Sequence, residues 1–207
     1  MKLYTYDIAP NPRRLTMFLQ YKGIDIDTQQ IDLGKKEQFS DSYRAINPDC
    51  SVPALVLDDG TALVDVVSIC LYLESLHPEK ALFGQSDLER AQVVGWMHRL
   101  YMNGLTAIAD MLRNQGDMFK DRALPGPGIV KQIPELIGRG RQRLDTFFNS
   151  MDEVCAERDY LVGDALSQAD IDLLAVCEFA SWVKVSVPES CTDLKAYLDR
   201  VRSQLAG

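Results

Sequence analysis

Residues 53–64, PALVLDDGTALV, constrain the fold more than any other part of this sequence, because they predict a β-hairpin. Two short apolar runs flank an Asp-Gly pair, which is the strongest short-range indication of a hairpin turn. Pro53 opens the first run, and a proline cannot donate a hydrogen bond to a sheet, so it must lie at an edge or in a special turn. Helical spacing of apolar residues follows directly, over residues 65–76.

The residues before the hairpin predict a strand, a helix and a second strand. Residues 2–8 favour a strand, and residues 11–23 then carry apolar side chains at helical spacing. Asn11 is expected to cap this helix, with Pro12 at its first position and Gly23 as its stop. Residues 25–33 alternate as a strand does, and residues 34–51 are polar with little periodicity. The predicted order is therefore β-α-β-(α)-β-β-α, ending near residue 76.

The remainder of the chain is helical in pattern. Residues 77–87 contain Pro78, Gly84 and Ser86 and predict a linker, and residues 124–128, LPGPG, predict a loop. We expect an α/β domain at 1–76, a linker at 77–87 and an all-helical domain at 88–207. The expected helices span residues 87–115, 129–154, 167–183 and 192–204.

Composition limits the classes of function. The 22 basic and 30 acidic residues give a net charge of −8, which disfavours binding to nucleic acid or to an anionic membrane. The 46% of hydrophobic residues include no run near the roughly 20 that a membrane span requires. The five cysteines form no C-x-x-C pair and there are two histidines, so we expect neither a metal site nor a disulfide framework. The N-terminus has no secretory pattern, so a cytoplasmic location is expected.

Two positions leave a structural and a functional interpretation open. A cis Val52–Pro53 bond would turn the Val52 N–H and C=O sideways into a cleft, whereas a trans bond would simply open a strand. Asn11 could be only a helix cap, or its amide could donate a hydrogen bond to a ligand. Tyr4 and Tyr6 are alternative hydroxyl donors, although tyrosines on a strand commonly pack in the sheet.

Residues 46–74, INPDCSVPALVLDDGTALVDVVSICLYLE, resemble the glutathione-binding half of glutathione transferases. The shared pattern runs from Asn-Pro through Val-Pro, an apolar strand and an Asp-Gly turn to an acid that opens a helix. Residues 167–176, SQADIDLLAV, resemble the capping box and hydrophobic staple of the helical half of that family. The resemblance implies a thioredoxin-like α/β N-terminal domain followed by an all-α domain, the glutathione transferase fold.

The resemblance also implies roles for individual residues. Pro53 would be cis, and the Val52 backbone would pair with the cysteinyl part of glutathione. Asn11 matches the residue that holds the thiolate in an Asn-bearing bacterial subgroup similar to the nu class, while Ala9 stands where that subgroup sometimes has a helper Thr. Gln38 matches a position that contacts the glycyl end.

The family's Glu-Ser pair, which grips the γ-glutamyl group, is replaced here by Asp65 and Val66. The acid is retained in shortened form and the hydroxyl is lost, so a backbone N–H at Val66 would have to hold the carboxylate. A missing charge-assisted hydrogen bond costs about 1.5–3 kcal/mol. The structural alternatives are that Asp65 only caps a helix and that Gln38 is a solvated loop residue. Cys50 is expected to be a buried or incidental thiol.

In this family the acceptor substrate lies beside the first long helix of the second domain, where Trp96, Tyr101 and Met102 are the candidate pocket residues. His98 and Leu105 lie on the same helix, and a stripe of this kind also suits a core or a dimer interface. Ser167 and Asp170 are expected to cap a buried helix without a catalytic role. The cluster Arg139, Arg141 and Arg143 predicts a solvated helix face, with an anion site as the alternative.

The hypothesis is a detoxifying glutathione transferase that uses glutathione as co-substrate and stabilises its thiolate for attack on a small electrophile. Its expected partners are that electrophile or a disulfide, and a second copy of the chain in a homodimer. A disulfide or peroxide reductase on the same site is one alternative. A catalytically silent module that binds a protein is the other, and the losses at Ala9 and Val66 favour it.

Overall fold

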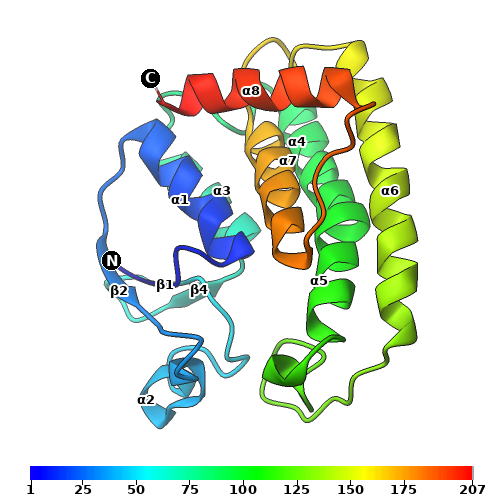
Figure 1. The fold of residues 1–207 in the computed structure, drawn as a ribbon. Coiled ribbons are helices and arrows are strands. Elements are labelled where there is room, and N and C mark those ends of the chain that lie inside the picture. The colour runs from blue at the N-terminus through cyan, green and yellow to red at the C-terminus, as the bar shows by residue number, and fades with distance from the viewer. Residues whose placement is uncertain (207) are drawn as a thin grey trace. The chain divides into compact units, whose positions relative to one another are not determined.

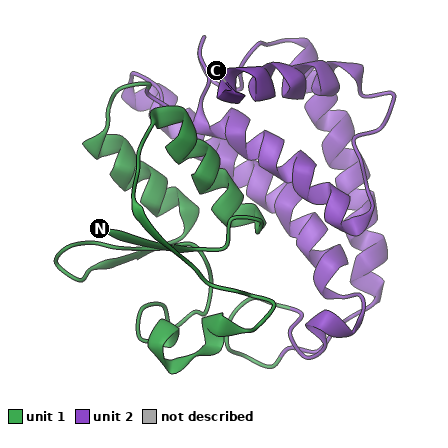
Figure 2. Cartoon of the chain, turned by 60° about the vertical axis from the view of Figure 1, so that its left-hand side comes forward, with its two compact units in different colours: residues 1–80, 124–129 green, residues 81–123, 130–207 purple. Residues whose placement is uncertain are grey.

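The computed structural model describes residues 1–206 and divides the chain into two compact units (Figure 2). The first unit comprises residues 1–80 and 124–129, and the second comprises residues 81–123 and 130–207. Each unit is considered by itself below.

A four-stranded mixed sheet forms the centre of the first unit (Figure 1). Its strands are β1 (Lys2–Thr5), β2 (Asp27–Gln30), β3 (Ala54–Val56) and β4 (Ala62–Val64), in the spatial order β2-β1-β3-β4. β1 runs parallel to β2 and antiparallel to β3, and β3 pairs antiparallel with β4. The predicted hairpin is confirmed, with Gly60 at a φ of 86° in its turn.

The helices α1 (Pro10–Lys22) and α3 (Val66–Leu76) pack against each other on one face of this sheet (Figure 1). Between β2 and β3 lie the short elements η1 (Glu37–Phe39) and α2 (Asp41–Arg44). The apolar sides of sheet and helices form a core of fully buried side chains that includes Leu3, Leu15, Phe18, Leu55, Ile69 and Leu73. The order of elements agrees with the predicted order, and the architecture is the thioredoxin-like arrangement that the resemblance implied.

The start of α1 differs from the prediction. The helix begins at Pro10, its cap is Ala9, and no side chain caps it. Asn11 is therefore the second helical residue, and the prediction that it is the N-cap was wrong. Proline suits the first position because its fixed φ is already helical and it has no N–H to satisfy, so Pro10 starts the helix before Asn11. The predicted stop at Gly23 is confirmed, with a left-handed φ of 69°.

The second unit consists of helices. The predicted helix over 87–115 is interrupted: α4 (Asp87–Leu100) continues through a π-helical turn, η2 (Tyr101–Leu105), into α5 (Thr106–Arg113). The other elements are η3 (Asp117–Phe119), α6 (Glu135–Ala156), α7 (Gln168–Phe179), η4 (Ala180–Val183) and α8 (Thr192–Ala206). α7 is buried along nearly its whole length, as expected for a helix at the centre of a bundle.

The predicted capping box at the start of α7 is confirmed. The N–H and the hydroxyl of Ser167 donate to one carboxylate oxygen of Asp170, at 2.7 and 2.8 Å. The other oxygen accepts from the N–H of Leu161 at 2.9 Å and from the hydroxyl of Tyr197. Burial raises the pKa of Asp170, against the effect of these hydrogen bonds. The network ties the loop after α6 and the helix α8 to α7.

Among residues 1–206, no helix is both long enough and apolar enough to cross a membrane.

Candidate active site

The strand register brings the candidate site residues of the first unit to one end of the sheet. Tyr4 in β1 pairs with Ala54 at the start of β3, and Ala54 pairs in turn with Val64 at the end of β4. Pro53 and Asp65 each lie one residue beyond that row of paired residues. The end of β1, the start of β3 and the end of β4 therefore share one sheet edge.

Two further segments leave the sheet at the same end. The loop that leads to Asn11 follows β1 directly. β2 runs parallel to β1, with Gln30 opposite Thr5, and the chain then passes into the segment that carries Gln38. Every residue that the resemblance assigned to glutathione thus follows or precedes a strand at one edge of the sheet.

Arg14 fixes the orientation of the Asn11 amide. The Nη1 atom of Arg14, a residue only 4% exposed, donates to Oδ1 of Asn11 at 3.0 Å. A guanidinium group can only donate hydrogen bonds, so the amide atom that faces it must be the oxygen. The amide nitrogen of Asn11 is therefore directed away from Arg14, and it can donate to a partner outside the helix.

The first turn of α1 offers few main-chain donors. Pro10 and Pro12 have no N–H, and the N–H of Arg13 bonds to the carbonyl of Ala9 at 2.9 Å. Within the described chain, Asn11 therefore supplies both the free main-chain N–H of this turn and a side-chain N–H. A helix start is favourable for an anion, and here that property is concentrated on one residue.

The Val52–Pro53 peptide bond is cis, as predicted. Ser51, the residue before this pair, is held by two buried side chains. The hydroxyl of Tyr43 and the Nδ2 of Asn47 both donate to the Ser51 carbonyl, the latter at 2.9 Å. Asn47 Nδ2 also lies 3.0 Å from Ser51 Oγ. Ser51 is thus committed to the internal hydrogen bonds of its own loop.

Burial raises the pKa of Tyr43 to about 12. Its hydroxyl is therefore neutral and remains a donor to the Ser51 carbonyl across the whole physiological range. Tyr4 packs edge-on against Tyr43 at a ring separation of 6.1 Å, and both Tyr4 and Tyr6 pack against the small cluster of Ile31, Tyr43 and Val52. This packing agrees with the structural interpretation of Tyr4 and Tyr6.

Asp65 has an unusual backbone conformation at the start of α3, with φ 73° and ψ 137°. It occupies the N-cap position, but its exposed side chain makes no capping hydrogen bond. The interpretation of Asp65 as only a helix cap is therefore incomplete, because the carboxylate does not bond to the helix that it precedes. The next residue, Val66, begins the helix and is buried.

Gln38 is 3% exposed, so the alternative that it is a solvated loop residue was wrong. Its Oε1 has no hydrogen-bond partner within the described structure. Cys50 is buried, with its thiol 3.4 Å from the Pro48 carbonyl, in agreement with the structural interpretation. No cluster of three or more His, Cys, Asp or Glu side chains suited to a metal ion occurs in residues 1–206.

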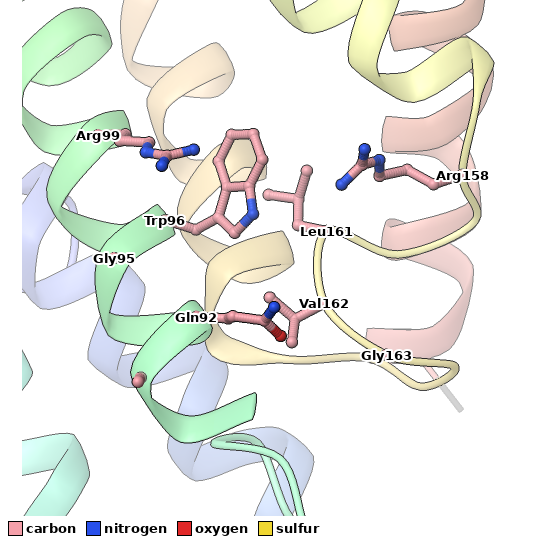
Figure 3. Close-up of a pocket in the computed structure, with 9 residues that line it drawn as sticks. Gln92, Gly95, Trp96, Arg99, Arg158, Leu161, Val162 and Gly163 are labelled. Carbon is pink, nitrogen blue, oxygen red and sulfur yellow. The ribbon is translucent and has the colours of Figure 1, made fainter. Parts of the chain in front are cut away.

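The three candidate acceptor residues do not meet in either of two hollows of the helical unit. Trp96 lies on α4 and lines both hollows, of about 620 and 510 Å³, and Figure 3 shows the larger one. Tyr101 and Met102 belong to the π-helical turn, are 42% and 45% exposed, and line neither of these hollows. Their role in acceptor binding stays a prediction.

The sequence analysis missed Arg14, Asn47 and Tyr43. Arg14 follows Asn11 by three residues within a helix, a spacing that places two side chains on one face, and this spacing was the available indication. Asn47 is the Asn of the Asn-Pro pair that opens the quoted motif, but the motif gave it no role. Nothing in the sequence pattern marked Tyr43. The common target of both side chains, the Ser51 carbonyl, is a backbone atom.

A thioredoxin-like unit with a cis-Pro, followed by a helical unit, defines the class of this protein. Residues 3–81 match the family model of the glutathione S-transferase N-terminal domain, and residues 140–205 match that of the C-terminal domain. The chain belongs to the glutathione S-transferase family.

Individual relatives and solved structures support the same family. Glutathione S-transferase 2 of Saccharomyces cerevisiae is 30% identical over 209 residues, which cover 99% of this chain and 86% of that protein. Maleylacetoacetate isomerase of Pseudomonas aeruginosa is 29% identical over 176 residues, with 68% and 82% covered. The crystal structure of a glutathione S-transferase domain-containing protein from Marinobacter aquaeolei matches with a TM-score of 0.89 at 29% identity, covering 99% of this chain and 100% of that one.

Proposed function

We propose that this protein is a glutathione transferase that binds glutathione at the sheet edge of its first unit and stabilises the thiolate for attack on a small electrophile. The observation that carries the proposal is the oriented amide of Asn11 at a helix start, on the same sheet edge as the cis-Pro and Asp65. The family membership and the names of the relatives support it.

Asn11 is assigned the role of stabilising the glutathione thiolate. A thiol is a poor nucleophile and its pKa lies above neutrality, so a transferase must favour the deprotonated form. The side-chain N–H of Asn11 donates to the sulfur, and its main-chain N–H adds a second donor near the positive end of α1. The buried guanidinium of Arg14 orients the amide and adds positive charge behind it.

The other residues hold the tripeptide. The Val52 N–H and C=O pair with the backbone of the cysteinyl residue, in the manner of a short strand, next to the cis bond at Pro53. The Asp65 carboxylate pairs with the α-ammonium group of the γ-glutamyl residue. The Val66 N–H donates to the α-carboxylate of that same γ-glutamyl residue. The buried Gln38 lies on the segment assigned to the glycyl end.

Substitution of Asn11 tests the proposal. Asn11→Ala removes one hydrogen bond to a charged atom, worth about 1.5–3 kcal/mol, so kcat/KM for conjugation of a chloronitrobenzene should fall about ten- to a hundredfold. The pKa of bound glutathione, measured by thiolate absorbance in the ultraviolet, should rise. Asn11→Asp should raise it further, because a carboxylate repels the thiolate.

Arg14 provides the internal control. Arg14→Lys keeps the buried charge but loses the planar group that orients the amide, so it should lower kcat/KM in the parent protein and have little further effect beside Asn11→Ala. Equal thiolate pKa values in the parent and in both Asn11 variants would remove Asn11 from the mechanism. Additive losses in the double variant would remove Arg14 from its orienting role.

A further inference from the structure

Tyr43 anchors the segment that carries Gln38 to the sheet of the first unit. This segment comprises η1 and α2, and in Figure 1 α2 lies on the opposite side of the sheet from α1 and α3. Helical elements of three and four residues are too short to be stable by themselves. Their buried residues are Gln38 in η1 and Tyr43 in α2. The position of the segment therefore depends on contacts that these two side chains make.

The ring of Tyr43 packs on the face of the sheet that is turned away from α1 and α3. Side chains alternate along a strand, so Leu3 of β1 belongs to the core beneath those helices, whereas Tyr4 points to the other face. The rings of Tyr4 and Tyr43 meet edge-on at 6.1 Å, and Ile31 and Val52 complete the cluster around them. The buried ring of α2 therefore contacts the same cluster as Val52, the residue before the cis bond.

The hydroxyl of Tyr43 extends from this ring to the loop that leads to the cis bond. It donates to the carbonyl of Ser51, eight residues further along the chain, and that carbonyl also accepts from Nδ2 of Asn47 at 2.9 Å. Asn47 belongs to the turn before Ser51, where its own carbonyl accepts from the N–H of Cys50 at 3.0 Å. The bond from Tyr43 thus fixes the distance between α2 and the start of β3.

The main chain of Val52 follows Ser51 directly. Val52 is 9% exposed, and within the described chain neither its N–H nor its C=O has a hydrogen-bond partner. Buried main-chain groups are normally paired, so these two are available to a ligand. They are the groups that the proposed function assigns to the cysteinyl residue of glutathione. Because Tyr43 holds Ser51, the side chain that anchors α2 also determines where these groups lie.

Gln38 is coupled to Tyr43 through the residue that η1 and α2 share. Ser40 is both the C-cap of η1 and the N-cap of α2, and its hydroxyl accepts from the N–H of Tyr43 at 3.3 Å. The Oε1 of Gln38 is buried and has no hydrogen-bond partner within the described structure. The two short elements are therefore joined as one piece, and a displacement of Tyr43 would displace Gln38 as well.

We propose that Tyr43 is a positioning residue that holds the glycyl and the cysteinyl contacts of glutathione at a fixed separation. Its ring and hydroxyl join α2, and with it Gln38, to the loop that presents Val52. This inference rests on the proposed function, because it concerns glutathione at the same site. A ligand that reaches both contacts gains from their fixed separation, since neither segment has to be ordered on binding. A ligand that lacks the glycyl residue gains nothing from it.

Tyr43→Phe tests the proposal, because it removes the hydroxyl and keeps the buried ring. The Ser51 carbonyl retains Asn47 as a donor, so no buried acceptor is left unpaired and the variant should fold. Calorimetry compares glutathione with γ-glutamylcysteine, which lacks the glycyl residue. The parent should bind glutathione about tenfold or more tightly, since glutathione alone offers a glycyl carboxylate for hydrogen bonding. In Tyr43→Phe this ratio should fall to about threefold or less, with the affinity for γ-glutamylcysteine unchanged.

Tyr21→Phe on α1 is the matched control. Within the described chain the Tyr21 hydroxyl makes no hydrogen bond, so this variant should keep the parent ratio. A purely structural role of Tyr43 would weaken the binding of both peptides by the same factor, and an unchanged ratio in Tyr43→Phe would therefore overturn the proposal. Equal affinity of the parent for the two peptides would overturn it as well.

The same titrations separate this inference from the proposed function. A parent protein that binds neither peptide would contradict the proposed function itself, and the positioning role with it. A parent that binds glutathione but has the same peptide ratio as Tyr43→Phe would contradict the positioning role alone. Circular dichroism of each variant verifies that it is folded.

Discussion

At the scale of single residues, the strained backbone conformation of Asp65 is the most informative feature of the proposed site. Its φ of 73° and ψ of 137° lie near a region occupied almost only by glycine, and such a conformation costs of order 1–3 kcal/mol. The side chain makes no capping hydrogen bond that would offset this cost locally. Strain of this kind persists at sites where a side chain must be presented to a ligand.

Asp65→Gly should therefore separate stability from binding. Glycine relieves the strain but gains more freedom in the unfolded chain, so the free energy of unfolding in urea should rise by about 1 kcal/mol. The affinity for glutathione should fall about ten- to a hundredfold, because the ammonium group loses its carboxylate partner. Urea titration and calorimetry measure the two effects.

Asp65→Asn is the matched control, since asparagine keeps the size of the side chain and tolerates positive φ. It should lose affinity with little change in stability. Unchanged affinity in both variants would show that the Asp65 carboxylate takes no part in binding.

Single residues also show where sequence reasoning succeeded and where it stopped. The cis bond at Pro53 was predictable, because a whole motif surrounds it. The capping role given to Asn11 was wrong because Asn and Pro both suit helix starts, and the competition between Pro10 and Asn11 is decided by the loop before them. Arg14 was missed because its partner is a side-chain oxygen whose direction only the folded helix defines.

At the scale of elements, the π-helical turn between α4 and α5 is the feature that periodicity did not predict. A Cβ atom built at Gly104 would lie 2.5 Å from Val176 Cγ1 and 3.0 Å from Phe147 Cζ. The backbone of the turn therefore packs directly against α7 and α6. Arg143 and the hydroxyl of Thr106 both donate to the carbonyl of Met102 in this turn. The contacts with Arg143, Phe147 and Val176 come from distant segments, whereas a helical repeat reports only local spacing.

Gly104→Ala should destabilise the helical unit by about 1–3 kcal/mol, because the added methyl group overpacks a close contact. Thermal and urea unfolding measure the change. Gly138→Ala on α6 is the control: a Cβ there meets nothing within 4 Å, so the substitution should be stabilising by up to about 1 kcal/mol. A Gly104 variant as stable as the Gly138 variant would contradict the close approach.

The other elements were predictable to different degrees. The hairpin of β3 and β4 and the helices α7 and α8 follow strong local patterns, and the structure places them within a few residues of their predicted bounds. The helix α6 begins at Glu135, six residues after the predicted start at residue 129. The segment over residues 34–51 gave no pattern, and it forms only the short η1 and α2, held by hydrogen bonds of their own such as that from Tyr43 N–H to Ser40 Oγ.

At the scale of the whole molecule, the sequence predicted the class of fold because two kinds of periodicity occupy separate parts of the chain. Alternating strands and a helix precede residue 77, and helical spacing alone follows. The proposed glutathione site belongs to the first part, where the motif and the strand register agree. The electrophile of the proposed reaction could not be predicted, because helical spacing does not define which side chains of the second unit would contact it.

The central claim, that the sheet edge of the first unit binds glutathione as a thiolate, is tested most directly by calorimetric titration of the purified protein. Reduced glutathione and glutathione disulfide are titrated separately, with proton release measured in two buffers. The account predicts that reduced glutathione binds and releases a proton near neutral pH. Preference for the disulfide would favour the reductase instead, and absence of binding by both would contradict the claim and leave a silent interaction module.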